Sequence, residues 1–146
     1  SFVGVLKGQA DSTRTDVFTQ INTIASKRDY SMRRVQNARY GYIYNAWADG
    51  ETAFKNESQS GLTFKAMQQA AKANESIAAR VKQFVYRSKE EFYDYEKDPN
   101  ALHNLIDDPS HADRIREFRQ LMRKRMKDSG DPKLEQFEKE VQASRS

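Results

Sequence analysis

Residues 90–126 constrain the fold most, because they predict a strand, a tight turn and an amphipathic helix in direct succession. Phe92, Tyr93 and Tyr95 are aromatic residues of the kind that favour strands. The Asp98-Pro99 pair ends the strand, because proline has no backbone N–H and its φ angle is fixed. We therefore expect a short strand over 91–95, followed by a turn.

The helix is expected to begin at the second Asp-Pro pair, with Asp108 as the N-cap and Pro109 in the first turn. Ser110 with Asp113 is an alternative start, as a capping box. Apolar residues then recur at spacings of three and four, which is typical of a helix with one apolar face: Ala112, Ile115, Phe118, Met122 and Met126. A strand followed by such a helix predicts a helix lying across a sheet.

Three further strands are predicted upstream. Residues 17–24 alternate, but Phe18 and Ile21 cannot face the same side of a regular strand, so we expect a bulge or an early end. After a charged loop at 26–29, strands at 32–37 and 40–45 are expected to pair as a hairpin. The prediction is a small α+β domain: an antiparallel sheet of about four strands, packed by a C-terminal helix.

A helical insertion is predicted before the last strand, at 46–88. Residues 47–60 are polar and are expected to form a loop, whereas 62–85 have helical spacing. Because Asn74-Glu75-Ser76 interrupts this spacing, both one helix and two are consistent with it. Residues 133–146 are helix-prone but have few apolar residues, which leaves a terminal helix and a disordered tail as alternatives.

The order of several short motifs resembles the C-terminal end of the sulfatase family. The family's strand and turn, (E)-(L/F)-Y-D-x-x-x-D-P-x-x-x-x-N-L, is matched by Glu91, Phe92, Tyr93, Asp94, Asp98, Pro99, Asn104 and Leu105. Residues 30–35 resemble Y-P-M-R-x-V, with Ser31 in place of proline, and residues 1–8 resemble S-(F/L)-x-x-x-L-x-G. Tyr86-Arg87 is similar to the N-sulfoglucosamine sulfohydrolase-like branch. The resemblance covers about residues 1–132.

The resemblance implies that residues 1–132 are a C-terminal subdomain cut from a longer sulfuric-ester hydrolase. Its partner would be the N-terminal catalytic domain, and the parent would act on a sulfated carbohydrate such as a glycosaminoglycan, in the periplasm or outside the cell. The low hydrophobic content, 37% against 32% charged residues, suits a piece that borrows burial from a neighbour.

Catalysis by this chain alone is not expected. Sulfatases use a formylglycine, made from a C/S-x-P-S-R motif, and a divalent metal such as Ca²⁺ or Mg²⁺. This chain has no cysteine and no such motif. His103 and His111 are its two histidines and are interpreted as surface residues. We therefore predict no catalytic residue, metal ligand or cofactor here, and assign them to the parent.

Four polar residues are the predicted substrate-binding group: Gln20, Asn22, Lys27 and Arg28. In sulfatases, the loop after the first C-terminal strand approaches the substrate pocket. Some sulfamidase-like members have a His-His-Glu cluster there, where this chain has Thr23, Ile24 and Ala25. That departure argues against N-sulfoglucosamine specificity. Arg33 is predicted to be structural, paired with a carboxylate such as Asp94.

Other functions remain open from the residues alone. The net charge of +4 comes from 25 basic and 21 acidic residues that are well mixed, which usually indicates a solvated surface. Tyr40, Tyr42 and Tyr44 share one strand face and resemble an RNA-binding sheet in outline, although packing against another domain is the favoured interpretation. A basic module that binds RNA or another polyanion is the alternative function, and a dimer through the exposed sheet face is a third possibility. Nucleic acid is not the expected partner, and no apolar run has transmembrane length.

Overall fold

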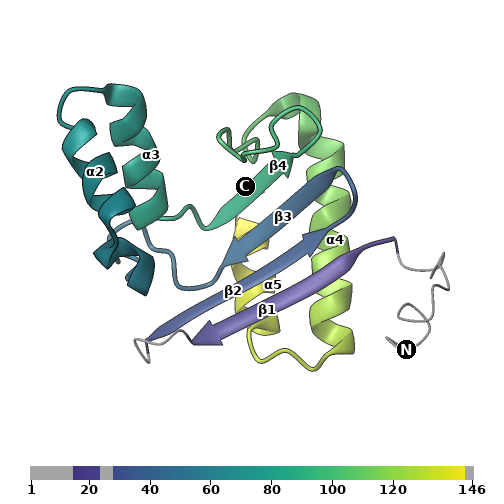
Figure 1. The fold of residues 1–146 in the computed structure, drawn as a ribbon. Coiled ribbons are helices and arrows are strands. Elements are labelled where there is room, and N and C mark those ends of the chain that lie inside the picture. The colour runs from purple at the N-terminus through teal and green to yellow at the C-terminus, as the bar shows by residue number, and fades with distance from the viewer. Residues whose placement is uncertain (1–14, 24–27, 144–146) are drawn as a thin grey trace, which may run out of the picture.

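The computed structural model describes residues 15–23 and 28–143. The sheet has four antiparallel strands in the order β1-β2-β3-β4 (Figure 1). They are β1 (Val17–Thr23), β2 (Asp29–Gln36), β3 (Tyr40–Asn45) and β4 (Glu90–Asp94). The helices are α2 (Leu62–Ala70), α3 (Glu75–Val85), α4 (Ala112–Asp128) and α5 (Leu134–Ala143), with short 3-10 turns η1 (Glu57–Ser60) and η2 (Pro109–His111). The predicted α+β class, with a helical insertion before the last strand, is confirmed.

The strand register follows the alternation of side chains. In β1 and β2, Phe18 lies opposite Val35, and the pairing shifts between Ile21 and Thr23. That shift is the predicted irregularity. It comes after Ile21, so Phe18 and Ile21 face opposite sides of the sheet and Ile21 is exposed. β2 begins at Asp29, three residues earlier than expected. The reason is that Asp29 accepts hydrogen bonds from the backbone and hydroxyl of Ser31, which hold the start of the strand.

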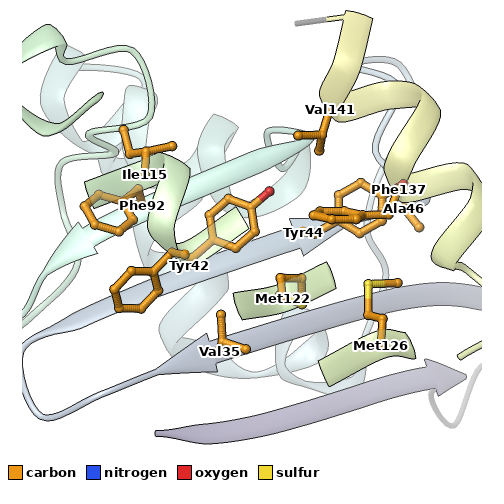
Figure 2. Packing of buried hydrophobic residues seen from close by; sticks show 11 residues of the cluster. Val35, Tyr42, Tyr44, Ala46, Phe92, Ile115, Met122, Met126, Phe137 and Val141 are labelled. Carbon is orange, nitrogen blue, oxygen red and sulfur yellow. The ribbon is translucent and has the colours of Figure 1, made fainter. Parts of the chain in front are cut away.

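Helix α4 lies across one face of the sheet, with α5 beside it (Figure 1). Asp108 caps the entry turn η2 by accepting a hydrogen bond from the Ser110 amide, as predicted for this Asp-Pro pair. The predicted apolar stripe of α4 is buried: Ile115, Phe118, Met122 and Met126. Figure 2 shows Met122 and Met126 packed with Tyr42 and Tyr44 of the sheet.

The end of the chain belongs to this core. Of the two alternatives for residues 133–146, the structure has a helix over Leu134–Ala143. Its Phe137 and Val141 are buried, and the Phe137 ring lies edge-on to Tyr44 at 4.9 Å (Figure 2). Two apolar residues one turn apart are sufficient to dock a helix whose other faces are polar.

The insertion forms two helices, not one. The Asn74 side chain accepts a hydrogen bond from the Ile77 amide and so caps the start of α3, at the point where the helical spacing is interrupted. Phe64 of α2 and Phe54 of the preceding loop both pack against Phe84 of α3. Among the described residues, no helix is long and apolar enough to cross a membrane.

Candidate functional site

The predicted substrate-binding residues lie along the β1–β2 hairpin. Gln20 and Asn22 are on β1 and exposed, and Arg28 is exposed immediately before β2. Lys27 lies outside the described residues. The hairpin therefore brings three of the four together, and whether they contact a substrate stays a prediction. Asn22 also has a structural contact, because its amide oxygen accepts a 2.8 Å hydrogen bond from Arg33.

Arg33 is buried and structural, but its predicted partner was wrong. It forms a buried ion pair with Asp131, in the turn before α5, and the NH2-to-Oδ1 distance is 2.8 Å. Arg33 also donates to the backbone oxygen of Ile21. Burial is the largest influence on the pKa of Asp131 and raises it. The hydrogen bonds from Arg33 and the Lys133 amide, with the charges of Arg33 and Lys133, together outweigh burial and hold that pKa below its usual value.

Asp94 pairs with Arg39 of the β2–β3 turn, at 2.8 Å. The Arg39 hydrogen bonds lower the pKa of Asp94, although burial opposes them. The physical reason for the wrong partner is the register: Arg33 lies opposite Tyr44, which pairs with Glu90 at the other end of β4 from Asp94. Arg39 instead directly precedes Tyr40, the residue that lies opposite Asp94. Arg33 points towards the end of the sheet where α4 turns into α5.

The motif residues that follow β4 cover the outer edge of that strand. The Asn104 side chain accepts from the Phe92 amide at 2.9 Å and donates to the Glu90 carbonyl at 3.1 Å. The Leu105 amide donates to the Phe92 carbonyl at 2.8 Å. Asp98 accepts from the amides of the turn that leads to Asn104. These residues are therefore structural, and they close an edge that would otherwise expose unpaired backbone groups.

The tyrosine face is covered by the chain's own helices, and not by another domain as predicted. Tyr42 and Tyr44 are fully buried in the core (Figure 2). The hydroxyl of Tyr42 donates to Glu90 at 2.6 Å, and that of Tyr44 donates to Glu140 of α5 at 2.5 Å. Burial raises the pKa of both phenols, and the neighbouring carboxylates raise it further. These two rings cannot stack on RNA bases, which require an exposed aromatic face.

A second polar site, which the sequence analysis missed, lies on the opposite face of the sheet. A hollow of about 270 Å³ lies here. From the sheet it is lined by Arg34, Glu91, Tyr93 and the following Tyr95, and from the other side by Arg80 of α3 and by Arg87, just after the helix. The one available signal was the alternation in β2, which places Arg33 and Arg34 on opposite faces. Nothing in the sequence placed α3 over this face.

Comparisons with known proteins give the fold its context. No family model and no curated protein matches this chain. Several solved structures do, and two of them are a protein from Bacteroides thetaiotaomicron VPI-5482 assigned as a sulfatase and a 2-O GAG sulfatase. Each is 19% identical, with a TM-score of 0.52, and each match covers 90% of this chain and 20% of the other. This fold occurs in sulfatases.

The resemblance carried by the motif residues is thus confirmed at the level of the fold, and the chain spans about a fifth of the length of the sulfatases it matches. The S-(F/L)-x-x-x-L-x-G segment, at residues 1–8, lies outside the described residues.

Within the described part of the chain, the side chains do not fit a divalent metal of the sulfatase kind. Across residues 15–23 and 28–143, no three His, Cys, Asp or Glu side chains gather as metal ligands. His103 is exposed and lies 3.5 Å from Asp98, and His111 contacts Asp108. Both carboxylates already accept backbone hydrogen bonds in turns. No catalytic step is therefore derived from these side chains.

Proposed function

We propose that this chain is a supporting subdomain of a sulfatase that acts on a sulfated carbohydrate. The observation that carries the proposal is the extent of the structural match, which includes 90% of this chain but only a fifth of each sulfatase. The remaining four fifths of each matched sulfatase lie outside the match, which supports a role for this chain beside a catalytic domain. That domain would supply the formylglycine and the divalent metal, Ca²⁺ or Mg²⁺.

The surface of β1 supports a partner on this side of the molecule. Val17 and Ile21 are 54% and 42% exposed, and β1 forms one edge of the sheet. Exposed apolar side chains beside an unpaired strand edge favour contact with another polypeptide. A dimer through the open sheet face is the competing arrangement, and analytical ultracentrifugation of the full-length protein distinguishes the two.

One of the matched structures is a 2-O GAG sulfatase, which supports a sulfated carbohydrate as the substrate class. We infer that the parent removes sulfate from a glycosaminoglycan or a similar polymer, in the periplasm or outside the cell. Gln20, Asn22, Lys27 and Arg28 would line one wall of its substrate pocket. Arginine and lysine suit a sulfate group because they offer charged N–H donors, and amide side chains suit sugar hydroxyls.

The decisive experiment uses the full-length protein that contains this chain. Sulfate release from 2-O-sulfated glycosaminoglycan disaccharides is measured for the parent and for Gln20→Ala and Arg28→Ala. We expect activity in the parent and an about tenfold lower kcat/KM in Arg28→Ala, from the loss of one charge-assisted hydrogen bond. Thr19→Ala is the control, because Thr19 is exposed on the same strand but faces the other side of the sheet. A full-length protein that releases no sulfate from any sulfated sugar would contradict the proposal.

A further inference from the structure

The hollow between α3 and the open face of the sheet has an unusual charge. Arg34, Ile43 and Glu91 are successive cross-strand partners on that face, opposite to the face covered by α4 and α5. Helix α3 adds Arg80 and Gln83, and Arg87 follows the helix. Among the residues that line the hollow, three guanidinium groups face one carboxylate.

Only one of the three arginines has its charge matched. Glu91 is fully buried and binds Arg87 at 3.2 Å, together with the Asn45 amide and the Tyr93 hydroxyl. Arg34 donates to the Tyr95 hydroxyl at 3.1 Å and lies over its ring. Arg80 donates to two backbone carbonyls, those of Ala101 and Asn100. Neither Arg34 nor Arg80 forms an ion pair with a described carboxylate.

Two guanidinium donors in the hollow also lack acceptors. The Nε atoms of Arg34 and Arg87 are buried and have no hydrogen-bond partner among the described residues. A buried donor without an acceptor costs free energy, and nearly all such groups in proteins are paired. An anionic oxygen in the hollow would satisfy both the charge and these donors, because the planar guanidinium matches carboxylate and sulfate groups.

The aromatic wall of the hollow suits a sugar ring. Tyr93 and Tyr95 are stacked, with ring centroids 6.2 Å apart. Tyr95 lies flat on the sheet, because Gly41 beneath it has no side chain: a Cβ there would be 2.5 Å from the Tyr95 hydroxyl oxygen. At about 270 Å³, the hollow is smaller than the 300–1,000 Å³ or so of pockets for drug-sized ligands. It has room for one charged group and part of a ring.

We propose that this hollow binds the sulfate or carboxylate group of an acidic sugar, with Arg34 and Arg80 as the charged donors. The proposal rests on the proposed function, in which the parent acts on an acidic carbohydrate. The site is separate from the predicted substrate wall, since Gln20 lies opposite Arg33 in the register and therefore faces the other side of the sheet. It would bind a sugar unit of the polymer other than the one whose sulfate is cleaved.

The test is a binding measurement on the full-length protein by isothermal titration calorimetry. The probes are a sulfated glycosaminoglycan tetrasaccharide, the same tetrasaccharide chemically desulfated, and neutral maltotetraose. The variants are Arg34→Met and Arg80→Met, with Arg123→Met as the matched control. Arg123 is exposed on α4 and pairs with Glu138, away from the hollow, so the control removes the same charge elsewhere. Hydrolysis of a small aryl sulfate reports separately on the catalytic centre.

We expect the affinity for the sulfated tetrasaccharide to fall about tenfold in Arg34→Met and in Arg80→Met, which is the loss of one hydrogen bond to a charged group. The control variant and aryl sulfate hydrolysis should be unchanged. A loss that persists with the desulfated probe identifies the carboxylate as the bound group, and a loss confined to the sulfated probe identifies the sulfate. Arg80 lies at the surface of α3, so Arg80→Met still tests the proposal if Arg34→Met fails to fold.

Unchanged affinity in both variants would overturn the proposal. It would also be overturned if the two variants weakened the binding of neutral maltotetraose as much as that of the charged probes. If both variants weaken saccharide binding but the full-length protein cleaves no sulfate ester, the binding site stands and the proposed sulfatase function falls.

Discussion

At the scale of single residues, the buried Arg33–Asp131 pair joins positions that are 98 residues apart. Its side chains are 1% and 0% exposed, so neither charge is solvated by water. A buried pair of this kind is sensitive to the loss of one member, because the other charge is then left without a partner in a poorly polar environment. Arg123 and Glu138 form an exposed pair that provides a comparison.

Replacing Arg33 by Met should lower the free energy of unfolding by about 3–5 kcal/mol, because Asp131 is left buried and unpaired. Arg123→Met should lower it by at most about 1 kcal/mol, since exposed pairs contribute little. Urea denaturation of both variants measures the difference. Combining Arg33→Met with Asp131→Leu should restore part of the loss, and equal losses for the two single variants would contradict the role given to the buried pair.

The same pair makes stability depend on pH in acid. The pKa of Asp131 is lowered from 3.8 in the folded protein, so the unfolded state binds more protons there. The stabilisation by the ionised carboxyl is therefore present above about pH 4 and is lost as the pH falls through the lowered folded pKa. The difference in unfolding free energy between the wild type and Asp131→Asn should be constant above about pH 5 and should shrink below pH 4. A difference that stays constant to pH 2 would be inconsistent with the lowered pKa.

At the scale of elements, β4 is stabilised by a turn and not by a fifth strand. Residues 104–105 bind the outer edge of β4 through one side-chain amide and one backbone amide, in place of strand pairing. This explains in physical terms why a D-P turn and an N-L pair follow the strand at a fixed spacing. Asp98 orders the turn, and Asn104 arrives beside Phe92.

Asn104→Ala should therefore loosen β4 selectively. The Phe92 amide loses its acceptor, which should cost about 1–3 kcal/mol, and its hydrogen exchange should become faster. Asn100→Ala is the control, because that residue contributes a backbone carbonyl to Arg80 and its exposed side chain has no hydrogen-bond partner within residues 15–23 and 28–143. Unchanged protection of the Phe92 amide in Asn104→Ala would show that the edge is held in another way.

At the scale of the whole molecule, the two edges of the sheet differ. The β4 edge is closed, whereas β1 exposes Val17 and Ile21 on its surface. The core lies on the other face, where α4 and α5 cover the tyrosines (Figure 1). The surface that the proposed catalytic domain would cover is therefore β1 and the hairpin that carries Gln20 and Arg28.

Changing both Val17 and Ile21 to Lys tests whether another domain covers β1 in the full-length protein. In the full-length protein the double variant should lose about 2 kcal/mol or more, because two charges would be placed in an apolar interface. In the isolated 146-residue chain the same changes should alter stability by only about 0.5 kcal/mol, as at ordinary surface positions. Thermal and urea unfolding of both proteins measure this, and a small effect in both would mean that no domain covers β1.

The sequence by itself determined the local structure, because local structure depends on neighbours in the chain. The strand at Tyr40–Asn45, the cap at Asp108 and the apolar stripe of α4 were all predicted, since alternation, capping and helical spacing are short-range signals. The order of the motif residues was also sufficient to indicate the fold that the structural comparison confirmed.

Only the tertiary structure decided which partners meet. Arg33 and Asp131 are far apart in the sequence, and several carboxylates were equally plausible partners for Arg33 until α5 was placed. The choice between a helix and a tail for the last residues depended on whether Phe137 could reach Tyr44. The hollow around Arg34 exists because α3 brings Arg80, Gln83 and Phe84 beside the open face of the sheet. Long-range contacts of this kind depend on the packing of whole elements, which no short sequence pattern records.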